Sequence, residues 1–190
     1  MPTPDRTSLE LIVSAARGIL ERSGADGLTM QAVADRVGVK APSLYKRVRN
    51  RDALVGLVVE STLVELAVRL ERARVSVSRD DVVAAVAREF RAFAHEFPVA
   101  YAVSVGPLPE HSRPAREILA ATSAPIIDAA ASVVGEQHAL EAARTITAWA
   151  NGFLGMELSG SFQLGGDVDA AFDYGVDILQ RALAVSVSER

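Results

Sequence analysis

Residues 29–54 read TMQAVADRVGVKAPSLYKRVRNRDAL, and this stretch decides the fold of the N-terminal part of the chain. It predicts a helix, a tight turn, a second helix and the start of a third, because its apolar residues recur at helical spacing. Thr29 is a suitable N-cap, Gly38 suits the left-handed residue after a helix end, and Pro42 fits the first turn of the next helix. The residues expected to pack a small three-helix core are Ala32, Val33, Val37, Val39, Leu44 and Val48.

The second helix of this stretch has one apolar and one basic side. At about 100° per residue, Ala41, Leu44 and Val48 fall together and point toward the core. The opposite side and its flanks carry Pro42, Ser43, Lys46 and Arg49, with Tyr45 and Arg47 at the edges. Five basic residues and no acidic one lie between Lys40 and Arg51. In a major groove, such a helix would offer side chains to base edges and phosphates. The alternative is an ordinary solvated, charged face.

The run Gly38-Val39-Lys40-Ala41-Pro42-Ser43-Leu44-Tyr45, with Val48 to Arg51 and Ala53-Leu54 after it, resembles a known domain. Together with Ala15-Ala16, Leu20, Gly24, Leu28 and Thr29 upstream, it is similar to the DNA-binding domain of the TetR family of bacterial transcriptional regulators. The resemblance implies an all-helical homodimer. Each subunit would carry one DNA-reading element and a larger C-terminal domain that binds a small effector.

The resemblance also implies which side chains contact DNA. By position these are Gln31, Pro42, Ser43, Tyr45, Lys46, Arg47 and Arg51, with Thr29 near the DNA backbone. Lys40 stands where the family often has a short capping residue. An ammonium has no acceptor atom and cannot cap a helix, so we expect Lys40 to contact a phosphate.

Composition and charge agree with a soluble protein that has one basic region. The 190 residues include 49% hydrophobic and 23% charged residues and no cysteine, which excludes disulfides and thiolate metal sites. The net charge of −4 is uneven, since residues 1–54 carry nine Lys or Arg against six Asp or Glu. We therefore expect a basic DNA-binding region at the N-terminus and an acidic remainder of the chain. With no apolar signal region at the N-terminus and no long apolar run, a cytoplasmic location is expected.

The apolar pattern predicts helices throughout the rest of the chain. The resemblance implies two domains: residues 1–54 would bind DNA, and residues 55–190 would bind the effector and dimerise. The predicted helices cover residues 8–23, 51–74, 79–97 (with Ser78 as cap), a short segment to 103, one from about Pro114 to 134, residues 137–158, and a last helix capped by Asp167. Residues 1–7 are expected to form a loose arm. Pro125 predicts a kink or break near Ser123. The helix from Arg51 is expected to link the two domains.

The last two helices are the predicted dimer interface, as a four-helix bundle with their copies. Gly152 and Gly155 cost helix stability, which favours close approach of a partner helix. The alternative is that both helices form the core of a monomer. The segment Ala148-Trp149-Ala150-Asn151-Gly152-Phe153 also resembles a TetR subgroup whose effector domain bears a Trp-His-Gly signature, with Asn151 in the place of the His.

No catalytic, cofactor or metal site is predicted. His95, His111 and His138 lack a second ligand at helical spacing, and no phosphate loop or nucleophile motif is present. A ligand cavity would need polar groups to orient its ligand and apolar walls. The candidates are His95, Tyr101, Arg116, Trp149 and Asn151, with Phe93, Phe153 and Met156 as wall residues; each has an alternative as a packing or surface residue.

The sequence thus predicts a dimeric regulator, a repressor that binds a pseudo-palindromic operator on double-stranded DNA and leaves it when a small apolar or aromatic effector binds. The alternative is a helical ligand-binding or protein-interaction module whose basic helix meets an acidic partner. An enzyme is not expected.

Overall fold

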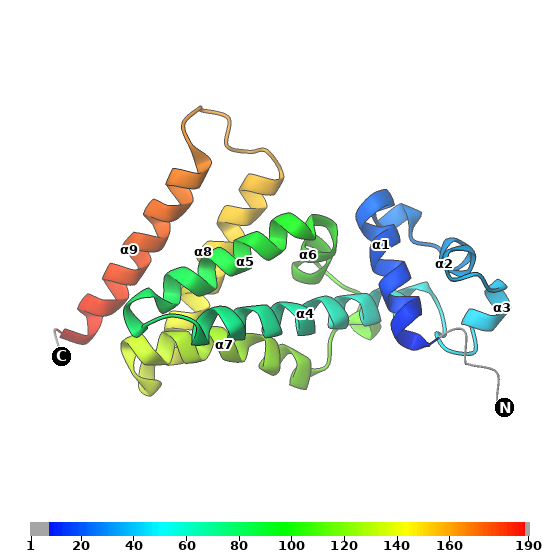
Figure 1. Ribbon diagram of the computed structural model, residues 1–190, viewed down its shortest axis with the longest axis horizontal. Helices are drawn as coiled ribbons and strands as arrows, with labels where there is room; N and C mark the ends of the chain where they lie inside the picture. Colours follow the sequence, from blue (N-terminus) through cyan, green and yellow to red (C-terminus); the bar gives the residue numbers. More distant parts are fainter. Residues whose placement is uncertain (1–7, 189–190) are drawn as a thin grey trace. The chain divides into compact units, whose positions relative to one another are not determined.

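A computed structural model describes residues 8–188 of the chain, and the side chains up to residue 185. Helices make up this part of the chain, and residues 8–188 contain no strand (Figure 1). The α-helices are α1 (Leu9–Gly27), α2 (Met30–Val37), α3 (Ala41–Leu44), α4 (Arg51–Val75), α5 (Val82–Glu96), α6 (Pro98–Val105), α7 (Arg116–Val134), α8 (Ala139–Leu158) and α9 (Val168–Ser188). The all-α prediction is confirmed. The arm predicted for residues 1–7 lies outside the described residues.

The chain packs as two compact units. One comprises the residues up to 63 together with 97–118, and the other comprises residues 64–96 together with those from 119 onward. Helices α4 and α7 each contribute to both units. The functional division into residues 1–54 and 55–190 stays a prediction.

The first unit has a continuous apolar core beneath the basic stretch. Ile12, Ala16 and Leu20 of α1 are buried there together with Leu28 and Val33. Leu44 and Val48 are 0% and 2% exposed, and Leu54, Val58 and Ala100 complete the core. Ala32, Val37 and Val39 are partly buried against it, so the predicted three-helix core is confirmed.

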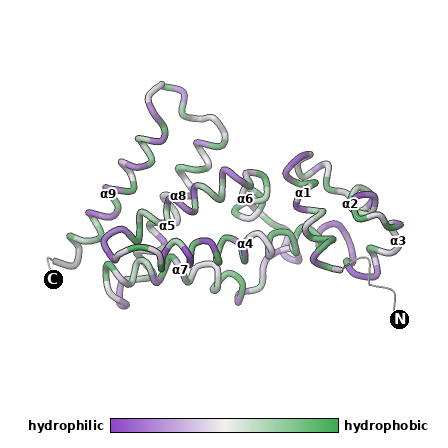
Figure 2. Tube along the Cα trace, in the orientation of Figure 1, coloured by the Kyte–Doolittle hydropathy of each residue, from purple (hydrophilic) through white to green (hydrophobic). Residues whose placement is uncertain are grey.

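In the second unit, α5 packs against both α8 and α9, and α8 packs against α9. Bands of hydrophobic and hydrophilic residues alternate along α9 (Figure 2). Phe172 and Val176 of this helix are buried with Ala84 and Ala87 of α5, and Trp149 and Phe153 of α8 pack against them. Other apolar residues of α9 are not internal, since Ala171 and Ile178 are exposed.

Several helix boundaries differ from the prediction. Ser78 does not cap α5, because its hydroxyl donates to the Asp81 carboxylate at 2.9 Å and a 3-10 turn, Arg79–Asp81, precedes the helix. Pro114 lies before α7, which begins at Arg116 after the 3-10 turn Glu110–Ser112. Helix α7 also continues through Pro125, so the break expected near Ser123 is wrong. A third 3-10 turn, Glu136–His138, precedes α8.

Helix α7 is also long and apolar enough, by length and composition, to cross a membrane. Core helices of soluble proteins have the same properties. Its C-terminal half is packed in this way, with Ile126, Ala129, Ala130, Val133 and Val134 all buried.

Candidate nucleic-acid interface

The turn between α2 and α3 is held by backbone geometry that the sequence specifies. The Thr29 hydroxyl accepts a hydrogen bond from the Ala32 amide at 3.1 Å and caps α2. Gly38 adopts φ 74° and ψ 33°, a left-handed conformation that favours glycine. The Val39 amide then donates to the Ala34 carbonyl at 3.0 Å, which closes the end of α2. The chain therefore enters α3 at a fixed angle.

Helix α3 is a single turn whose inner side is anchored by Leu44 and, beyond its end, by Val48. The residues that face solvent are Pro42, Ser43, Tyr45, Lys46, Arg47 and Arg49. Tyr45 is 53% exposed. The predicted division into an apolar side and a basic side is confirmed, although the α-helix is shorter than the stretch suggested. No side chain caps it, as expected with Lys40 at the N-cap.

Several cations of this region have no partner among residues 8–188. The side chains of Lys40, Lys46 and Arg49 are exposed, and among the described residues none of the three makes a hydrogen bond or ion pair. Gln31 differs, because its amide donates to the Asp35 carboxylate at 2.7 Å along α2. The exposed surface around α3, from Lys40 to Arg49, thus presents positive charge that an external anion can use.

Arg51 behaves differently from the other basic residues of the stretch. Its Nε donates to the Leu28 carbonyl at 2.7 Å, and its Nη2 donates to the Ala25 carbonyl. These two donors face the corner between α1 and α2. The role of Arg51 as a phosphate contact, implied by the resemblance, stays a prediction.

The proposed ligand residues fall into separate environments. Trp149 and Phe153 meet Phe172 in an aromatic cluster, with ring centroids 5.2 Å apart in both contacts with Phe172. Phe93 is fully buried in the same unit. Asn151 is half-buried, and Met156 is 48% exposed.

Tyr101 and Arg116 belong to the other compact unit. Tyr101 is buried, and desolvation raises the pKa of its hydroxyl to about 12. Arg116 is exposed. The structure therefore brings together Trp149 and Phe153 from the predicted set.

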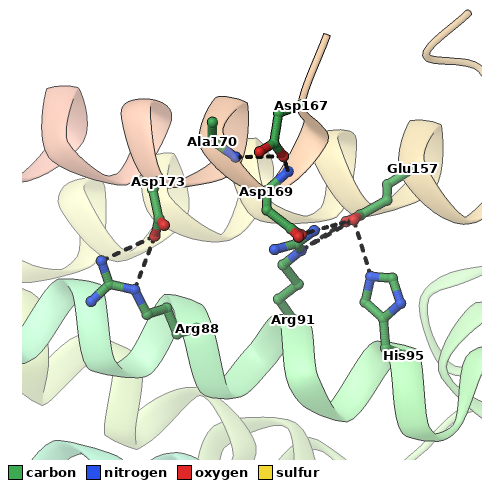
Figure 3. Close-up of polar contacts among 8 residues, drawn as sticks. All are labelled: Arg88, Arg91, His95, Glu157, Asp167, Asp169, Ala170 and Asp173. Carbon is green, nitrogen blue, oxygen red and sulfur yellow. Dashed lines mark hydrogen bonds and ion pairs between the residues drawn. The ribbon is translucent and has the colours of Figure 1, made fainter. Parts of the chain in front are cut away.

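His95 lies in a polar groove of about 500 Å³ between α5 and α9, in a network shown in Figure 3. Arg91 is paired with Glu157 of α8 and, at 2.6 Å, with Asp169 of α9. Nε2 of His95 lies 3.2 Å from Glu157, and Arg88 pairs with Asp173 at 3.0 Å. This network was not predicted from the sequence, although its three basic residues share one face of α5.

The charges in this groove stabilise one another. Burial opposes ionisation of Glu157, but hydrogen bonds from Arg91 and His95 more than offset it and lower the pKa of the carboxyl. The hydrogen bond to Glu157 in turn raises the pKa of Arg91. Among the described residues, no group of three or more His, Asp or Glu side chains is arranged to hold a metal ion.

The glycines of α8 and α9 also separate into two kinds. A Cβ on Gly175 would lie 2.4 Å from the Trp149 ring, so α9 can pack on this ring only because residue 175 has no side chain. A Cβ on Gly152 or Gly155 would meet nothing within 4 Å. Among the described residues, no helix closely approaches Gly152 or Gly155, whereas α8 and α9 meet closely at Gly175. The approach of a partner helix at Gly152 and Gly155 stays a prediction.

Comparison with known sequences gives matches for both parts of the chain. Residues 12–58 match the family described as bacterial regulatory proteins, tetR family, and residues 83–179 match the tetracyclin repressor-like C-terminal domain. An uncharacterized HTH-type transcriptional regulator of Mycobacterium tuberculosis is 32% identical over 176 residues, which are 89% of this chain and 78% of the relative. The class A tetracycline repressor of Escherichia coli is 41% identical over 54 residues, 28% of this chain and 25% of the repressor.

Solved structures share the fold. A protein of unknown function from a Rhodococcus species superposes with a TM-score of 0.79 at 25% identity, covering 97% of this chain and 100% of that protein. A TetR variant from Acinetobacter baumannii in complex with minocycline gives a TM-score of 0.71 at 22% identity, covering 95% and 98%. The second likeness concerns the fold alone.

Proposed function

This chain belongs to the TetR family of bacterial transcriptional regulators and is a DNA-binding regulator, and we propose that it acts as a cytoplasmic, dimeric repressor released from its operator by a small molecule. The observation that carries the proposal is the exposed basic surface of residues 40–49, where Lys40, Lys46 and Arg49 have no partner among the described residues.

We assign the DNA contacts by where each side chain lies. Pro42 and Ser43 of α3 and Lys46 in the turn after it are exposed and would meet base edges in the major groove. Tyr45, Arg47 and Lys40 would hold phosphates at its margins, with Thr29 and Gln31 at the start of α2 close to the DNA backbone. Two such readers in a dimer would address half-sites with centres about 34 Å apart.

The dimer would form through the exposed sides of α8 and α9. Ala148, Gly152 and Gly155 are exposed on α8, and on α9 Tyr174 and Ile178 are 66% and 45% exposed. Small residues on one helix and large apolar ones on the other permit close packing with a second copy. The open space beside Gly152 and Gly155 supports this assignment.

The effector would bind in the C-terminal domain, where the cluster of Trp149, Phe153 and Phe172 supplies aromatic surface. We place the domain in the Trp-His-Gly subgroup, with Asn151 in the His position. Both assignments rest on the resemblance, so the effector is proposed only as a small apolar or aromatic molecule.

Effector binding would reach the reader through contacts inside the first unit. The Glu21 carboxylate of α1 accepts hydrogen bonds from the amides of Val99 and Ala100 at 3.2 and 2.8 Å, at the start of α6. The Ser112 hydroxyl donates to the Asp52 carbonyl of α4 at 3.0 Å. A shift of α6 or of residues 110–112 would therefore act on α1 and on the first turn of α4. A ligand that favours one arrangement changes operator affinity in this way.

Selection of bound fragments from a random duplex pool tests the proposal directly. We expect a pseudo-palindromic consensus, bound by a dimer with an affinity that falls steeply with salt. If the two readers together neutralise roughly 6 to 10 phosphates, log affinity should fall with log salt at a slope of roughly −5 to −9. Salt-insensitive binding, or the absence of any sequence preference, would favour a module that meets an acidic protein partner.

A further inference from the structure

The corner between α1 and α2 is an irregular segment that needs an external support. Gly24 has φ 69° and ψ −177°, so the regular course of α1 is interrupted there before one further turn to Gly27. The Leu28 amide donates to the Ala25 carbonyl at 3.3 Å, and the Thr29 amide donates to Gly27 at 3.0 Å. The carbonyls of Ala25 and Leu28 also accept hydrogen bonds from Arg51.

We propose that Arg51 is a positioning residue for operator reading: it fastens the corner between α1 and α2 to the start of α4 and so fixes the orientation of α2 and α3. This inference rests on the proposed function. Its consequence is that removal of Arg51 weakens operator binding through the protein and not through a lost phosphate contact.

The contacts of Arg51 make it suited to this role. A guanidinium that donates from Nε and Nη2 to two carbonyls forms charge-assisted bonds with a fixed geometry. A cation is also favoured near the carbonyl end of a helix. Leu28, one of the two acceptors, has a fully buried side chain and directly precedes Thr29, the N-cap of α2. The hydrogen bond to the Leu28 carbonyl therefore holds the backbone directly before Thr29, where α2 begins.

The first turn of α4 is held in place by its own contacts. Arg51, which lies in this turn, can therefore support the corner between α1 and α2. The Asn50 carboxamide oxygen accepts a hydrogen bond from the Ala53 amide at 2.8 Å and caps the helix. On Asp52, the backbone carbonyl accepts from Ser112 and the carboxylate lies 3.1 Å from Nε2 of His111. Gly56 lies against the Ser112 backbone, where a Cβ would be only 3.3 Å away. The first turn of α4 is thus tied to residues 111–112 as well as to the corner.

The test compares Arg51→Gln, Arg51→Lys and a matched control, Arg49→Gln, on the duplex recovered from the random pool and on a scrambled duplex. Arg49 is an exposed arginine two residues away with no partner among the described residues. Thermal unfolding is measured first, and DNA affinity is then measured over a range of salt, at a temperature where every variant is folded.

If Arg51 is a positioning residue, Arg51→Gln lowers the ratio of operator to scrambled affinity about tenfold and leaves the salt slope unchanged. Arg51→Lys keeps the charge but loses the two-carbonyl geometry, so it shows most of the same loss. The Tm of Arg51→Gln falls by about 3 °C, as expected for a loss of about 1 kcal/mol in a chain of this length, whereas that of Arg49→Gln does not change. A purely structural role would lower Tm but leave the affinity ratio of the folded protein intact.

A phosphate contact would give the opposite pattern and would overturn the inference. Arg51→Gln would then reduce the salt slope by about 0.9 for each contact, or about 1.8 for a dimer, and Arg51→Lys would bind almost normally. An unchanged affinity ratio would also overturn it. Failure of the wild-type protein to select any duplex would instead reject the proposed function, so the two failures are distinguishable.

Discussion

The basic side chains around α3 and those along α5 and the neighbouring part of α4 differ in what they contact. Lys40, Lys46 and Arg49 are exposed and have no partner among the described residues. By contrast, Arg91 is paired with two carboxylates, and Arg69 of α4 contacts Glu89 and Glu96 at 2.5 and 2.6 Å. The same residue types are therefore exposed and available to an external anion in one region, and hold helices together in the other.

This contrast predicts that charge reversal lowers DNA affinity strongly in the region around α3 and only slightly on α5. Lys46→Glu combined with Arg47→Glu should lower operator affinity by at least about 100-fold, roughly 2.7 kcal/mol, while the circular dichroism spectrum stays helical. The measurement is fluorescence anisotropy with labelled duplex. Arg88→Glu is the matched control, because Arg88 is exposed but paired with Asp173, and its effect on DNA affinity should be small. Equal effects from both changes would remove the distinction.

Substitution of the paired arginines on α5 should change the stability of the protein and not its DNA affinity. Arg91→Met leaves Glu157, which is only 10% exposed, without its main partner, and should lower the free energy of unfolding by about 2–3 kcal/mol. Arg88→Met breaks an exposed pair and should cost at most about 0.5 kcal/mol. Urea unfolding measures both values. If Arg91→Met/Glu157→Leu did not recover stability relative to Arg91→Met, an unpaired carboxylate could not be the cause of the loss.

A third prediction separates packing within the chain from packing between copies. Gly175→Ala should destabilise the protein by about 1–2 kcal/mol, because the new methyl group meets the Trp149 ring. Gly152→Ala meets nothing within the chain and should be neutral or stabilising in the monomer, since alanine favours helices.

Light scattering adds the test of the interface. If α8 and α9 form the dimer, the larger side chain of Gly152→Leu should shift the population toward monomer. A Gly152→Leu variant that dimerises as tightly as the wild type would place the interface elsewhere.

The smallest expected effect concerns pH. The folded protein lowers the pKa of Glu157 below its unfolded value, which is about 4.3 for glutamate. The carboxylate therefore contributes stability above that pH, and the contribution is lost as the pH falls through the folded pKa. Unfolding measured from pH 7 to pH 3 should show the difference between wild type and Glu157→Gln narrowing below about pH 4.3. A difference that stays constant over this range would contradict the assignment.

Local features of the fold were predictable from the sequence because they depend on neighbours along the chain. Thr29 and Asp167 cap helices as predicted, with the Asp167 carboxylate accepting from the Asp169 amide at 2.9 Å. Gly38 is left-handed, and Leu44 is buried while Lys46 is exposed. Helical spacing and cap chemistry suffice for these predictions.

Contacts between distant residues were not predictable in the same way. Arg91 and Glu157 are 66 residues apart, and Arg51 lies 23 residues from Leu28. Spacing along one helix does not reveal which helix packs against it, so the sequence indicated Arg51 as a basic residue and a DNA contact but not as a partner of the carbonyls at Ala25 and Leu28. Gly175 was missed for the same reason, since its importance depends on the Trp149 ring of another helix.

The shortness of α3 has a consequence for engineering. Leu44 within the turn and Val48 just after it carry the burial, and the outward residues make no contribution to that core. Exchange of Pro42, Ser43 and Lys46 for other side chains should therefore retarget the protein to new operators without rebuilding its scaffold. A synthetic peptide limited to this turn, in contrast, would not form a stable helix in water and should not bind DNA specifically.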